Sequence, residues 1–173
     1  MQEPPDDANL QSAVKCTGAK GIVYDLEGWL GSSTNWQASC NKYIAMFPDL
    51  WHIACPLGHG RTESNQPRVI YPPVVGFTHI APMAYGGAGS YGTVGQWTKA
   101  FVKGVFDKTQ NDGWPKSKTF LTFQSASIAN LNANAYAPDV IQLLLQQRGE
   151  YAGMLGWGSS ENDNKASGHV LFR

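Results

Sequence analysis

The sequence predicts an α/β fold built around parallel strands. Short apolar runs alternate along the chain with segments of helical periodicity, which is the pattern of βα units. The apolar runs are nearly continuous rather than alternating, which is typical of strands covered on both faces. A length of 173 residues suits one domain with one core, and we assign residues 1–173 to it.

Five apolar runs are predicted to form the strands. They are Gly21–Glu27, Trp51–Leu57, Val75–Tyr85, Thr119–Gln124 and Ala152–Trp157. Since chemistry in parallel α/β sheets collects at the carboxyl ends of the strands, those ends are the places to look for a site.

Caps and apolar stripes predict helices between most of these runs. The helices run from Asp6 or Asp7 to near Gly18, from Thr34 to Phe47, from about Thr93 to Gln110, and from Pro138 to Gly149. Pro48 stops the second helix because it cannot continue a helix. Pro138 suits a first helical turn, and Gly149 suits the residue just past a helix end. The polar, proline-rich segment Gly58–Val74 is predicted to be a loop.

Charge and hydropathy exclude several classes of partner. Lys plus Arg and Asp plus Glu number 13 each, so the chain lacks the basic surface that nucleic-acid binding requires. No apolar run approaches the roughly 20 residues of a membrane-spanning helix, so no membrane partner is expected. The first ten residues lack the basic and apolar regions of a signal peptide, which leaves a cytoplasmic protein or a secreted one whose leader is removed.

Neither the cysteines nor the histidines predict a metal site, and no cofactor is predicted. Cys16, Cys40 and Cys55 contain no paired spacing and are expected to be buried free thiols, with a Cys40–Cys55 bridge as the alternative in a secreted chain. The histidines, at 52, 59, 79 and 169, form no metal-binding motif. His52 and His79 fall in predicted strands, where packed and hydrogen-bonded side chains are expected.

The first strand ends in two acids, Asp25 and Glu27. Their spacing places both on one face of a strand, where mutual repulsion raises one pKa and lowers the other. That division separates a proton donor from a carboxylate that stays ionised, as glycoside hydrolysis requires. The alternative is a solvated strand end that carries two surface acids.

A second candidate is the Gly-x-Gly-x-x-Gly sequence Gly87–Gly92, which follows a strand and precedes a helix. Pro82 lies near the end of the preceding strand, and the next strand ends in Gln124 and Ser125 without an acid to bind a ribose. These features favour a flexible turn over a dinucleotide site. They leave a small flavodoxin-like domain, binding a nucleotide or phosphate, as an alternative reading of the chain.

Taken together, the strand ends resemble the family 18 glycoside hydrolases, the chitinase family. The sequence YDLEG resembles the last D-x-E of the fourth-strand motif D-x-x-D-x-D-x-E, and APMAYGG resembles the M-x-Y of the sixth strand. IACPLG is similar to the fifth-strand segment, and YAGMLGWGSSEND to the final strand with its Trp. The order and spacing agree over residues 21–163. The family has a (β/α)8 barrel, so the resemblance implies strands 4 to 8 of such a barrel.

The resemblance also implies substrate-assisted hydrolysis of N-acetylglucosamine-containing glycans. Glu27 would be the general acid, Asp25 would orient the acetamido group, and Tyr85 would donate a hydrogen bond to that group. The substrate-binding residues would be Trp157 as the floor of the subsite, Met83 as a lining residue, Gln124 as a partner of sugar hydroxyls by its position, and Trp29 as a further stacking surface.

Three departures from the family bear on these roles. Lys20 and Val23 stand where the family motif has its first two acids, and Gly86 follows Tyr85 in place of Asp or Asn. A non-catalytic carbohydrate-binding relative is therefore the alternative function. A full barrel takes about 250 residues, so the chain corresponds to part of a longer protein, an assembled half, or a shortened open sheet with sequential strand order. Open edges at the first and last strands predict self-association.

Overall fold

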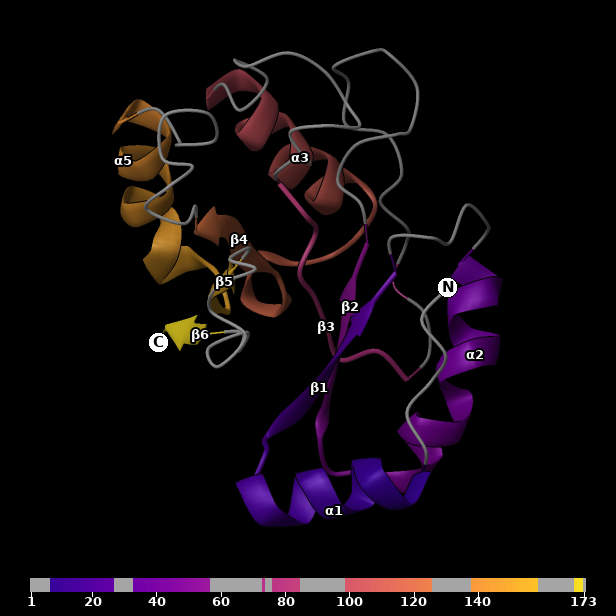
Figure 1. The fold of residues 1–173 in the computed structure, drawn as a ribbon. Helices are drawn as coiled ribbons and strands as arrows, with labels where there is room; N and C mark the ends of the chain where they lie inside the picture. The colour runs from indigo at the N-terminus through magenta and orange to yellow at the C-terminus, as the bar shows by residue number, and fades with distance from the viewer. Residues whose placement is uncertain are drawn as a thin grey trace, which may run out of the picture.

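The computed structural model describes residues 7–26, 33–56, 73, 76–84, 99–125, 138–158 and 170–172. Within these ranges, parallel strands alternate with helices along the chain (Figure 1). The predicted α/β class is therefore confirmed at the level of parallel strands combined with helices.

The strands form two small sheets. The first contains β1 (Gly21–Asp25), β2 (Trp51–Cys55) and β3 (His79–Ile80), which are parallel and lie in the order β1-β2-β3. The second contains β4 (Phe120–Ser125), β5 (Gly153–Gly158) and β6 (Val170–Phe172), in which β4 and β5 are parallel. Neither sheet closes on itself within the described part of the chain.

An isolated parallel bridge between Ile80 and Thr119 joins the two sheets at β3 and the start of β4. Spatial order therefore follows chain order from β1 to β5. In a flavodoxin-like sheet, β1 would lie between β2 and β3, whereas here β2 lies between β1 and β3. The strand order expected from the flavodoxin-like alternative is thus wrong for this sheet.

Two predicted strand features are corrected. Among the described residues 76–84 of the run Val75–Tyr85, a ladder forms at His79–Ile80, with a further bridge residue at Met83, and Pro82 between them has no N–H to donate. The five predicted strands also do not include β6, which pairs antiparallel with β5 through the partners Met154–Phe172 and Gly156–Val170. A row of five parallel strands with both outer edges open is therefore not what the structure contains.

The helices follow their predicted positions closely. They are α1 (Asp7–Thr17), α2 (Ser33–Met46), α3 (Lys99–Asn111) and α5 (Pro138–Gln147). Short 3₁₀ turns precede β4 and β5, at η1 (Lys116–Lys118) and η3 (Arg148–Glu150). The fourth predicted helix therefore ends at Gln147 as an α-helix, and its last residues tighten into η3. The part of the third helix before Lys99 and the predicted loop Gly58–Val74, except Pro73, lie outside the described residues.

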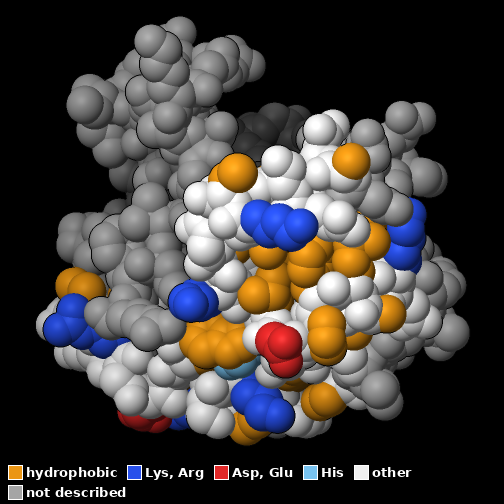
Figure 2. Space-filling model, turned by 90° about the horizontal axis from the view of Figure 1, so that it is seen from below, with side chains coloured by type: hydrophobic (Ala, Val, Ile, Leu, Met, Phe, Trp, Pro, Cys, Tyr) orange, Lys and Arg blue, Asp and Glu red, His pale blue; other side chains and the backbone are white. Residues whose placement is uncertain are grey.

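Figure 1 shows the first sheet running through the middle of the molecule, with α1 below it and α2 beside it. The helices α3 and α5 lie on the side of the second sheet. The described side chains of α1 are all exposed or half-buried, Leu10 and Val14 among the latter. Seen from the α1 side, hydrophobic side chains gather near the middle of the surface, with basic side chains around them (Figure 2).

The core extends over both sheets and one face of α3. Its largest fully buried side chains include Trp114, Phe106 and Phe120. A close approach between β1 and β2 requires glycine at position 21, where an added Cβ would lie 2.9 Å from both the Cβ and the carbonyl oxygen of Trp51. Gly18 has φ +59° just past α1, which suits the left-handed end of a helix.

The cysteine prediction is correct for two residues and wrong for the third. Cys40 and Cys55 are buried free thiols, whereas Cys16 is exposed on α1. Burial raises the pKa of the Cys40 thiol to about 12. Cys16 lies on a helix whose described side chains are all exposed or half-buried, a property that residue type alone does not indicate.

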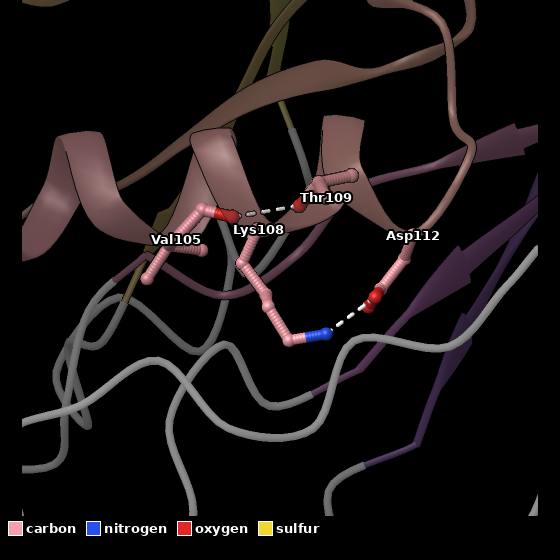
Figure 3. A network of polar contacts seen from close by, with 4 residues as sticks. All are labelled: Val105, Lys108, Thr109 and Asp112. Carbon is pink, nitrogen blue, oxygen red and sulfur yellow. Dashed lines mark hydrogen bonds and ion pairs between the residues drawn. The ribbon is translucent and has the colours of Figure 1, made fainter.

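The C-terminal end of α3 is stabilised by local polar contacts (Figure 3). The Thr109 hydroxyl donates a hydrogen bond to the carbonyl oxygen of Val105 at 2.8 Å. One turn away, the Lys108 ammonium forms an ion pair with Asp112 Oδ1. The other carboxylate oxygen, Asp112 Oδ2, is buried and has no hydrogen-bond partner within the described part of the chain. Lys108 thus neutralises a carboxylate that lies just beyond the helix end.

Candidate functional site

The carboxyl ends of the first three strands lie next to one another at the same end of the first sheet. Asp25, the last residue of β1, is the ladder partner of Cys55, the last residue of β2. The next residue, Leu26, donates its N–H to the Cys55 carbonyl oxygen at 3.0 Å, and Met83 donates to that of Pro56 at 2.9 Å. The backbone after β1, β2 and β3 therefore runs side by side.

The second sheet adds two more strand ends in register. Gln124 of β4 is the ladder partner of Trp157 of β5. Because the Ile80–Thr119 bridge is parallel, the carboxyl ends of β4 and β5 point in the same direction as those of the first sheet. Asp25, Gln124 and Trp157 thus occupy the last or next-to-last positions of three strands. The side chains of these three residues lie outside the described part of the structure.

Met83 is the one predicted site residue whose side chain the structure describes. It is 1% exposed and belongs to the core cluster. Its side chain therefore packs beneath the strand ends, and its predicted contact with a substrate stays a prediction. Glu27, Trp29 and Tyr85, together with the glycine-rich segment Gly87–Gly92, lie outside the described residues.

A buried hydroxyl that the sequence analysis missed fixes the end of β3. Thr122 of β4 is 1% exposed, and its hydroxyl donates a hydrogen bond to the Pro82 carbonyl oxygen. The same oxygen, Thr122 Oγ1, accepts a hydrogen bond from the Ala84 N–H at 3.0 Å. The hydroxyl therefore takes the place of the ladder that Pro82 interrupts. It holds the backbone that leads directly into Tyr85.

Thr122→Val is expected to lower the free energy of unfolding by about 1–3 kcal/mol, because the Pro82 carbonyl and the Ala84 N–H lose their buried partner. Thr122→Ser is the matched control, since it keeps the hydroxyl. Urea unfolding would measure the loss. Amide exchange should show faster exchange at Ala84 in the valine variant and unchanged exchange at Met83, which bonds Pro56 instead. Unchanged exchange at Ala84 would contradict the assigned role.

The two described histidines are packed and hydrogen-bonded, as predicted. His52 is 1% exposed, and its Nε2 lies 2.9 Å from the Phe47 carbonyl oxygen. Since a carbonyl only accepts, Nε2 carries the proton and Nδ1 accepts from the Tyr24 hydroxyl at 2.7 Å. Burial, with smaller effects of Cys40 and Tyr43, raises the pKa of Tyr24, which keeps its hydroxyl protonated. The pair is a satisfied internal contact that connects β1 to β2.

His79 lies in an aromatic cluster at the amino ends of the strands. Its ring centroid is 4.5 Å from that of Trp51 and 5.5 Å from that of Phe120. Its Nδ1 lies 2.9 Å from the Thr78 hydroxyl oxygen. Burial, and to a smaller extent the Lys118 ammonium, lowers the pKa of His79 below its ordinary value. The cluster belongs to the opposite end of the strands from the predicted site.

This pKa shift predicts a pH-dependent stability. The unfolded chain binds a proton at His79 as the pH falls through about 6.5, whereas His79 of the folded chain stays neutral until the pH is lower. The contribution of neutral His79 to the free energy of unfolding is therefore fully present above that pH. It is lost progressively as the pH falls toward the lower pKa that His79 has in the folded protein. Urea unfolding of wild type and His79→Phe at two pH values, above and below this point, measures the effect. The difference in free energy of unfolding between the two proteins should change with pH. A constant difference would contradict the lowered pKa of His79.

The described residues contain no group of three or more His, Cys, Asp or Glu side chains that could hold a metal ion. Across the same ranges, no helix combines the length and hydropathy needed to cross a bilayer. Comparison of the chain with protein-family models, with curated proteins and with solved structures finds no match.

Proposed function

We propose that this chain is a chitinase-like protein that binds N-acetylglucosamine-containing glycans at the carboxyl ends of its parallel strands and cleaves them by substrate-assisted acid catalysis. The observation that supports this most is the sequential order of the strands, with their carboxyl ends at one edge. That order brings the backbones of Asp25, Gln124 and Trp157 to corresponding strand ends. The finer form of the fold, strands 4 to 8 of a (β/α)8 barrel, is part of the same proposal.

In this mechanism the two acids at the end of the first strand have separate roles. Glu27 protonates the leaving glycosidic oxygen, and its pKa must be raised to donate near neutral pH, which a neighbouring carboxylate favours. Asp25 orients the substrate acetamido group and stabilises the positive charge of the oxazolinium intermediate. Tyr85 donates a hydrogen bond to the same group. Trp157 and Trp29 supply stacking surfaces, and Gln124 binds sugar hydroxyls.

Binding without turnover is the second candidate, and Val23 is the observation that favours it. Val23 precedes Asp25 by two residues on β1 and packs half-buried against the core cluster. An apolar side chain there cannot donate a hydrogen bond to Asp25 or share a proton with it. The resembling family has an acid at this place, so the charge of Asp25 lacks that support. The proposed sugar site would then keep its stacking surfaces and lose catalytic power.

Incubation of the wild-type protein with a chromogenic chitooligosaccharide tests the two candidates together. Release of the chromophore, absent with the matching cellooligosaccharide that lacks acetamido groups, is expected for the hydrolase. Quenching of Trp fluorescence without release would indicate the binding protein. If the experiment shows no release and no quenching, both candidates are refuted. The cellooligosaccharide control matters because the mechanism uses the acetamido group itself.

A further inference from the structure

A single backbone bridge joins the two sheets in the described part of the chain. It pairs Ile80 of β3 with Thr119, the residue just before β4, and the two strands are parallel there. The Ala81 N–H donates to the Ala54 carbonyl oxygen of β2 at 2.7 Å. Because backbone groups alternate in direction along a strand, Ile80 turns its own N–H and C=O groups away from β2, toward the second sheet. We call the Ile80–Thr119 bridge the sheet joint.

The register of the sheet joint places His79 opposite Lys118, since each of them comes one residue before its bridge partner. Phe120 is then the diagonal neighbour of His79 on β4. On β2, His79 is the ladder partner of Ile53, which makes Trp51 its diagonal neighbour on that side. The ring distances agree with this placement, because the His79 ring contacts those of both Trp51 and Phe120. One titratable ring thus connects three neighbouring strands beside the sheet joint.

The charged group that acts on His79 is another cation. Within the described residues, β2 presents the Trp51 ring to His79 and β4 presents the Phe120 ring, and neither carries a charge. From η1, the Lys118 ammonium disfavours a second positive charge at His79. The Thr78 hydroxyl lies 2.9 Å from His79 Nδ1, and because a hydroxyl both donates and accepts, this contact favours neither form of the ring. A proton on His79 would therefore set two cations against each other at the sheet joint.

We propose that the sheet joint is a pH-sensitive contact, in which uptake of a proton by His79 opens the bridge between β3 and β4 while the ladders inside each sheet stay closed. Like charges that lie opposite each other on neighbouring strands destabilise the pairing of those strands. The joint is one bridge, whereas the β1–β2 ladder extends over all five residues of β1 and the β4–β5 ladder over all six of β4. The Thr122 hydroxyl still ties the carboxyl end of β3 to β4, so the opening is confined to the amino end.

The opening of the joint differs from the loss of global stability at low pH, because only the backbone groups of the bridge become exposed. In the open form His79 takes up its proton near its ordinary pKa of about 6.5, and in the closed form at a lower pH. The open form therefore gains population as the pH falls below that value. The gain is at most about tenfold for each unit by which the pKa is lowered in the closed form. The inference uses the sheet joint alone and does not depend on the proposed sugar chemistry.

Amide exchange of the full chain from about pH 8 to about pH 5, the range in which histidine titrates, tests the proposal. Protection of the Ile80 amide, relative to its intrinsic exchange rate at each pH, should fall as the pH is lowered. Protection of the Ala81 amide should stay constant, because that amide bonds to β2 inside the first sheet. His79→Phe keeps an aromatic ring but removes the titratable group, so in this variant the protection of Ile80 should no longer depend on pH.

An NMR titration of the His79 ring gives a second measurement in case His79→Phe does not fold. The pKa of His79 should lie below about 6.5 in the wild type, and Lys118→Gln should raise it. Lys116→Gln is the matched control, since Lys116 belongs to the same turn but has an ion pair of its own, and it should leave the pKa of His79 nearly unchanged.

Three results would each overturn the proposal. The first is an Ile80 protection that does not depend on pH in the wild type, or that falls equally in His79→Phe. The second is a pKa of His79 at or above its ordinary value, which is expected if the Trp51 ring stabilises the cation instead. The third is an unchanged pKa of His79 in Lys118→Gln.

Discussion

Glu27→Gln is expected to lower the rate of chitooligosaccharide hydrolysis by about 10²–10⁴-fold, the usual contribution of a general acid. Glutamine keeps the size and polarity of the side chain but has no proton to give the leaving oxygen. Substrate affinity should change little, because the stacking and hydrogen-bonding groups remain. Initial rates with the chromogenic substrate measure the loss, and Trp fluorescence titration measures the affinity.

Asp25→Asn is the companion variant, because it separates the two carboxylates. It should also lower the rate, and it should move the alkaline limb of the pH–rate profile to lower pH, since Glu27 must be protonated to act and loses the neighbouring charge that raises its pKa. Equal rates for wild type and Glu27→Gln would remove Glu27 from the mechanism. An unshifted profile in Asp25→Asn would show that the two acids do not interact.

Phe120→Ala is expected to cost about 3–5 kcal/mol of unfolding free energy, the range for removal of a buried phenylalanine ring. Phe120 is 1% exposed at the start of β4, and its ring contacts those of Trp51 and His79. The cavity would therefore open where the two sheets are joined. Small proteins are stable by only about 5–15 kcal/mol, so the loss is a large share of the total.

Phe120→Leu is the control, because it keeps an apolar side chain that fills most of the space. Its loss should be clearly smaller than that of the alanine variant in urea or thermal unfolding. Trp51 lies 6.2 Å from Phe120 between ring centroids, so its fluorescence is also expected to change in the alanine variant. A loss below about 1 kcal/mol in Phe120→Ala would show that the site collapses without a lasting cavity.

The sequence was sufficient to predict the elements whose signals are local. The apolar run at Trp51 and the proline-bounded segment at Pro138 became β2 and α5 close to their predicted bounds. Helix ends, apolar stripes and buried runs depend on residues near one another in the chain, so they are readable without a structure. The parallel arrangement was also predictable, because the runs are apolar on both faces.

Features that depend on contacts between distant residues were not predictable. Pro82 shortens β3, and the compensating hydroxyl of Thr122 comes from 40 residues further along the chain. β6 is only three residues long, and its place in the sheet is set by its pairing with β5. In the predicted site, the alignment of Asp25 with Cys55 and of Gln124 with Trp157 is likewise a property of the register. Residue types at strand ends indicated where to look, but only the pairing brings those ends together.

The unequal burial of the three cysteines gives the molecule one chemically addressable position. Cys16 faces solvent on α1, while Cys40 and Cys55 are shielded and the Cys40 thiol is held in its unreactive protonated form. A maleimide dye should therefore attach to the native protein at α1 and reach the other two sulfurs only when the core opens. The chain thus carries its own attachment point for a fluorophore, placed on a helix that no proposed sugar contact uses.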